Sequence, residues 1–154
     1  MSLSQPRWLA AIGGALLAHV ILIASAIAWV AVYSYLIAPG LEVSAYHAHA
    51  RVSAPWVSLL VGIPVLFLLC LRIGRLAPLQ ARATTLALLA IYLCTDMFML
   101  LATTPVELVP WGLVLANYGA KFAAGWLGGE SAHGLRRDSL HEGSMGAGTI
   151  GTRR

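Results

Sequence analysis

The chain has 154 residues, of which 59% are hydrophobic and 10% are charged, and its formal net charge is +4. Roughly a quarter of the residues of a soluble domain are charged, so this composition predicts an integral membrane protein and not a soluble one. The positive charge lies mainly outside the apolar runs. This placement favours a role in membrane topology and lipid contact, and it argues against nucleic-acid binding.

Four apolar runs are each near or above the ~20 residues that a helix needs to cross the hydrocarbon core. They cover residues 8–37, 57–76, 83–102 and 106–127. Although Ala24-Ser25-Ala26 resembles a signal-peptide cleavage site, the first run is too long for a signal peptide and is interpreted as an uncleaved span. We therefore predict an all-α membrane protein, with a four-helix transmembrane domain over residues 1–127. The glycine- and serine-rich residues 128–154 are predicted to form a flexible cytoplasmic tail.

The basic residues predict the orientation of the chain. Arg72, Arg75 and Arg82 surround the connection between the second and third runs, and Arg136 and Arg137 follow the fourth run. The positive-inside rule places this side in the cytoplasm, so both termini are predicted to be cytoplasmic. The predicted location is the bacterial cytoplasmic (inner) membrane.

Small residues recur every four positions along the fourth run, and we call this set the small-residue stripe. It consists of Gly112, Ala116, Ala120, Ala124 and Gly128. Such a stripe allows helix backbones to approach closely within a membrane. A shorter stripe, with Gly14 at its centre, lies in the first run. The simpler interpretation is that the first and fourth helices pack together through these stripes, and the alternative is that one of them contacts another subunit.

Asp96 lies inside the third apolar run, where an isolated charge costs roughly 3 kcal/mol. Its helical spacing from Tyr92 places both residues on one face, which we predict to point into the bundle. Counting ~1.5 Å per residue from the cytoplasmic helix ends places several polar residues at the same depth. The predicted midplane polar cluster consists of His19, Asp96, Asn117 and Tyr118, with Tyr92 and Lys121 as further polar contacts. Lys121 is counted one turn nearer the cytoplasm, where its side chain is expected to extend to the surface.

The segment YHAHAR in the outer connection contains His47 and His49. Two imidazoles can ligate zinc or copper, but a site needs further ligands, so a solvated loop is favoured over a metal site. The sequence contains no GxSxG or HExxH motif and no phosphate-binding glycine loop. We therefore predict no catalytic residue, no cofactor and no metal.

Two classes of function remain. The first is a structural or accessory component of a homo-oligomer or a larger membrane complex, with the lipid bilayer and other membrane subunits as partners. The alternative is a small proton- or solute-handling transporter or channel that uses His19 and Asp96. A water-accessible path from Asp96 to a surface would favour transport, whereas a dry and fully paired Asp96 would favour a structural role.

Overall fold

A computed structural model describes residues 5–76 and 78–147, with side chains for residues 5–76, 78–107 and 109–132. All the regular elements in these ranges are helices, which confirms the predicted all-α class. They are α1 (Trp8–Val32), the π-helical turn η1 (Tyr33–Ile37), α2 (Val43–Leu76), α3 (Ala81–Thr103), the 3₁₀ turn η2 (Val106–Leu108) and α4 (Trp111–Ala147).

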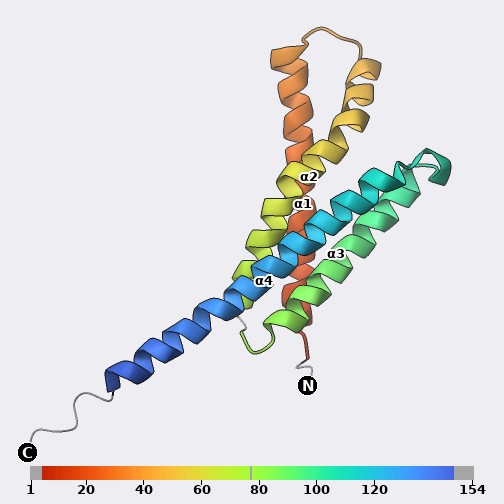
Figure 1. Ribbon diagram of the computed structural model, residues 1–154. Helices are drawn as coiled ribbons and strands as arrows, with labels where there is room; N and C mark the ends of the chain where they lie inside the picture. The colour runs from red at the N-terminus through yellow and green to blue at the C-terminus, as the bar shows by residue number, and fades with distance from the viewer. Residues whose placement is uncertain (1–4, 77, 148–154) are drawn as a thin grey trace, which may run out of the picture.

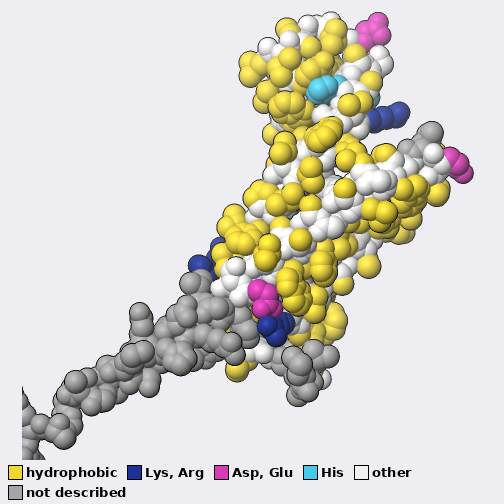
Figure 2. Space-filling model, viewed as in Figure 1, with side chains coloured by type: hydrophobic (Ala, Val, Ile, Leu, Met, Phe, Trp, Pro, Cys, Tyr) yellow, Lys and Arg dark blue, Asp and Glu magenta, His cyan; other side chains and the backbone are white. Residues whose placement is uncertain are grey.

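Three helical segments are long and apolar enough to cross a membrane: Trp8–Ile37, Val43–Leu76 and Ala81–Thr103. Hydrophobic side chains cover the middle of the surface in Figure 2, and several charged side chains lie toward its two ends. This distribution is the one expected of a membrane bundle. α4 is less apolar, because Asn117 and Lys121 lie within its first three turns.

α2 begins at Val43, well before residue 57, so the YHAHAR segment forms helical turns and the predicted loop is wrong. Alanines favour helix in this extension. The hydroxyl of Tyr46 also ties its start to the preceding turn, because it donates to the Ala38 carbonyl and accepts from the backbone N–H of Leu41. Pro55 is accommodated inside the helix.

α4 begins at Trp111 and not at residue 106, because two prolines frame the segment before it. Pro105 precedes the 3₁₀ turn, and the carbonyl of Pro110 accepts the first helical hydrogen bond, from Val114. At its other end the helix continues to Ala147, into the segment predicted to be a tail. The flexibility of that segment stays a prediction.

The four long helices form an elongated bundle that opens at one end (Figure 1). α4 lies along α2, while α1 packs against both α2 and α3. The hairpin of α1 and α2 projects beyond the connection between α3 and α4. The start of α1 and the far end of α4 lie toward the opposite end, which we call the inner end.

Glycines make close helix contacts in the half of the bundle nearest the inner end, which we call the inner half. The remaining half is called the outer half. A Cβ atom added to Gly14 would lie 2.5 Å from the Leu88 side chain, and one added to Gly128 would overlap the backbone carbonyl of Phe67. The stripe of α1 therefore meets α3, so the interpretation that it packs on α4 is wrong. Ile73 of α2 lies 3.0 Å from the same Cβ position, so Gly14 packs between α2 and α3.

The small-residue stripe of α4 is packed at its inner end and open at its outer end. Gly128 is buried, Ala120 and Ala124 are half-buried, and Gly112 and Ala116 are exposed. Among the described residues, no heavy atom lies within 4 Å of a Cβ built on Gly112. A contact of this outer part with another chain stays a prediction.

Candidate functional site: a buried lysine at the bundle centre

Lys121 of α4 lies at the centre of the polar cluster, and its side chain is 0% exposed. Its ammonium donates to the Ser58 hydroxyl of α2 at 2.7 Å and to the Tyr92 hydroxyl of α3 at 3.0 Å. It also lies 3.7 Å from Oδ2 of Asp96, which completes an ion pair. One ammonium thus joins three helices.

Gly62 of α2 makes room for this lysine. A Cβ at Gly62 would lie 2.7 Å from Cε of Lys121, so the missing side chain leaves the space that the lysine stem fills. The expectation that Lys121 extends to the cytoplasmic surface is therefore wrong. The depth count assumed that α4 ends level with the other helices near residue 127, whereas it continues to Ala147.

Aromatic rings surround the charged pair. Nζ of Lys121 lies 5.3 Å from the ring centroid of Tyr92 and 5.9 Å from that of Tyr118. Such distances allow an attraction between the cation and the ring faces. His19 of α1 is in contact with the Tyr92 ring at a centroid distance of 4.6 Å, so the cluster extends to the fourth helix.

Asp96 points into the bundle but is not fully enclosed, because 28% of its side chain is exposed. It lines a cavity of about 170 Å³ together with His19 and Ser58. Its carboxylate is therefore paired on one side and accessible on the other. Asp96 is thus neither fully paired and dry, as a purely structural ion pair requires, nor free of a partner.

His19 and Asn117 have unpaired atoms. Nδ1 of His19 lies 2.9 Å from the Ala15 carbonyl, so it must carry the proton, since a carbonyl only accepts. Nε2 of His19 and Oδ1 of Asn117 are buried and have no hydrogen-bond partner among the described residues. The structure thus brings His19, Tyr92, Asp96, Tyr118 and Lys121 together, and it places Asn117 nearby without a side-chain bond to them.

Ser58 belongs to the site, although it was not among the residues predicted from the sequence. The signal was a spacing of four residues: α2 buries Gly62, Leu66, Cys70 and Gly74, and Ser58 lies one turn before them. A serine on this line of buried positions is the residue that a neighbouring polar group can reach.

The outer histidines occupy a different environment. His49 stacks on Tyr33 with ring centroids 3.5 Å apart and an angle of 5° between the planes, whereas His47 is exposed. No group of three or more potential metal-ligating side chains occurs in the part of the chain that the structure describes. His49 contributes to the packing between α1 and α2.

Comparison of the chain with protein families, with characterised proteins and with solved structures gave no match.

Proposed function

We propose that this protein is a four-span integral membrane protein of the bacterial cytoplasmic membrane, serving as a structural or accessory component of a homo-oligomer or larger membrane complex. The observation that carries the proposal is the complete burial of Lys121, with polar partners on two other helices. We call this arrangement the lysine clasp.

The lysine clasp favours a structural role because its bonds fix geometry. A buried ion pair contributes little net stability, since desolvation offsets most of the attraction, but removing one partner is costly. Bonds between polar side chains of membrane helices likewise contribute modestly. The clasp therefore determines how α2, α3 and α4 sit relative to one another, as a scaffold requires.

The outer half of α4 offers a surface for a partner helix. Gly112 and Gly119 are exposed, and no described atom comes within 4 Å of a Cβ placed on either. Backbones of membrane helices associate closely at such positions. A second copy of this chain or another membrane subunit would fit there.

α4 is proposed as the fourth span. The polar residues that lower its hydropathy, Asn117 and Lys121, are buried against the other helices, while Leu115 and Phe122 are exposed. Its outward face thus suits lipid. With four spans and the arginines on the inner side, both termini are cytoplasmic. A C-terminal reporter that is active only outside the cytoplasm should stay silent, and an active one would contradict this topology.

The assembly is tested by purification in mild detergent, followed by mass measurement and identification of co-purifying proteins. Gly112→Leu fills the open face of α4 and should reduce the assembled fraction. Gly13→Leu is the matched control, because Gly13 on α1 is also exposed and has no atom of the described chain within 4 Å of its Cβ position. A monomeric wild-type protein without partners, or equal effects of the two changes, would contradict the proposal.

A second candidate function is proton or solute handling, and the partial exposure of Asp96 to a cavity favours it. In liposomes, Asp96→Asn should then abolish a pH-dependent flux while the protein still folds. Wild-type protein that produces no flux above empty liposomes would exclude this candidate.

A further inference from the structure

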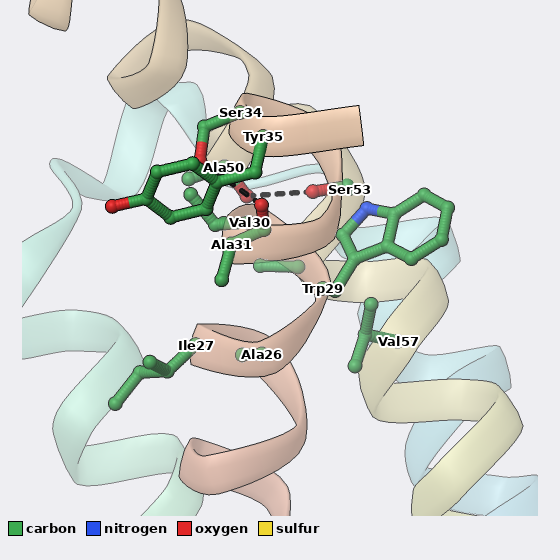
Figure 3. A pocket seen from close by; sticks show the side chains of 11 residues that line it. Ala26, Ile27, Trp29, Val30, Ala31, Ser34, Tyr35, Ala50, Ser53 and Val57 are labelled. Carbon is green, nitrogen blue, oxygen red and sulfur yellow. Dashed lines mark hydrogen bonds between the residues drawn. The ribbon is translucent and has the colours of Figure 1, made fainter. Parts of the chain in front are cut away.

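An apolar groove lies between α1 with η1 on one side and the first half of α2 on the other (Figure 3). Its volume is about 460 Å³. Small and branched side chains line most of it, and the aromatic rings of Trp29 and Tyr35 border it. The two helices diverge here, as Figure 1 also shows.

The groove adjoins the cavity beside the lysine clasp. Ala26, Ala54 and Val57 line both spaces, so these residues form their common wall. Asp96 and His19 line the cavity but not the groove. The combined space is therefore apolar along most of its length and polar at its deep end.

The deep end offers hydrogen-bond acceptors. The Asp96 carboxylate is 28% exposed and borders the cavity. His19, only 9% exposed, borders it as well, and its Nε2 is an acceptor without a partner among the described groups, because Nδ1 carries the proton. A ligand that fits this end must bring a donor.

The charge of the site selects a neutral donor. Lys121 lies 3.7 Å from Asp96, so the pair has no net charge. A cationic ligand would find its attraction to the carboxylate largely cancelled by the ammonium, whereas a hydroxyl needs only the acceptor. An alcohol with an apolar chain satisfies both ends of the space.

We propose that this space binds a neutral, lipid-soluble alcohol or phenol, with its hydroxyl donating to Asp96 and its apolar chain lying in the groove between α1 and α2. Nε2 of His19 is an alternative acceptor for the same hydroxyl. Trp29 and Tyr35 cover the chain near the outer opening. This site is independent of any assembly through α4.

The test uses the full chain in phosphatidylcholine bilayer discs and three photoreactive probes with the same diazirine-bearing alkyl chain. One probe ends in a hydroxyl, one in its methyl ether and one in a quaternary ammonium. The hydroxyl probe should label peptides of α1 and α2 that line the groove about tenfold more than the ether, since a hydrogen bond to a charged acceptor is lost in the ether. Equal labelling by alcohol and ether, or stronger labelling by the ammonium probe, would overturn the proposal.

Two further changes locate the ligand. Ala54→Trp places a large ring where the two spaces join and should abolish groove labelling. Ala48→Trp is the control, because Ala48 is equally on α2 and exposed but lines neither space. His19→Phe keeps a ring beside Tyr92 but removes the alternative acceptor, so the alcohol probe should still label more than the ether probe, but by a smaller ratio. Labelling that survives Ala54→Trp unchanged would place the probe elsewhere and overturn the site.

Discussion

The inner and outer halves of the bundle are built on different principles. In the inner half, glycines leave room for side chains of the neighbouring helices: Gly74 faces Ala132, and Gly125 faces Leu89. In the outer half, α1 and α2 diverge around a groove, and glycines of α4 have open space in front of them. Glycines are thus tightly packed in the inner half and face open space in the outer half.

The difference shows that a small residue permits close packing but does not cause it. Gly128 meets the backbone of Phe67 in α2, whereas Gly112, near the start of α4, has no described neighbour within 4 Å of its Cβ position. The lysine clasp lies between these regions. From this polar connection toward the outer end, α1 and α2 diverge (Figure 1).

The largest effect is expected for Lys121→Met, which removes the connection between the two halves. The change keeps most of the side-chain volume but leaves Asp96, Ser58 and Tyr92 without their partner. Loss of one member of a buried pair costs about 3 kcal/mol. Thermal unfolding in detergent should show this loss as a clearly lower midpoint.

A second change tests whether the ion pair itself accounts for this loss of stability. Asp96→Asn removes the negative charge, so the double variant with Lys121→Met no longer strands a carboxylate and should regain part of the lost stability. If the two losses simply add, the ion pair does not hold the helices together.

The next largest effect is expected for Gly128→Ala in the inner half. The added methyl group overlaps the backbone of Phe67, which cannot rotate away, so α4 must move from α2. Overpacking of this kind costs about 2 kcal/mol. Gly112→Ala, on the same stripe but in open space, is the control and should leave the unfolding midpoint unchanged. Equal destabilisation by both changes would mean that the halves do not differ in packing.

A smaller loss is expected for Ser58→Ala. The ammonium of Lys121 loses one acceptor but keeps Tyr92 and Asp96, so the cost should be about 1 kcal/mol. Ser53→Ala is the control, because Ser53 lies on the same helix and its hydroxyl donates to the carbonyl of Ala50 within that helix. If the Ser58 variant were as stable as the Ser53 variant, Ser58 would not contribute to the lysine clasp.

The sequence allowed the helical class, three of the four apolar spans and the inward direction of Asp96 to be predicted, because helical periodicity determines which residues share a face. Depth was harder to predict. Lys121 was counted too near the cytoplasm because the apolar residues of α4 stop well before the helix does. Ser58 was missed because only the facing lysine shows that the serine has a partner. The groove was not predictable either, since it depends on the angle between α1 and α2, which no sequence period records.

The smallest effect is expected at the inner end, where Arg82 of α3 forms a bidentate ion pair with Glu130 of α4 at 2.7 and 2.9 Å. The two side chains are 51% and 31% exposed, so water and salt screen their attraction. Arg82→Gln should therefore leave the unfolding midpoint unresolved from wild type at physiological salt and lower it slightly only at low ionic strength. Arg75→Gln is the control, because Arg75 is exposed and no ion pair to it occurs among the described side chains. A loss as large as that of Lys121→Met would mean that surface charge, and not glycine packing, holds the inner half together.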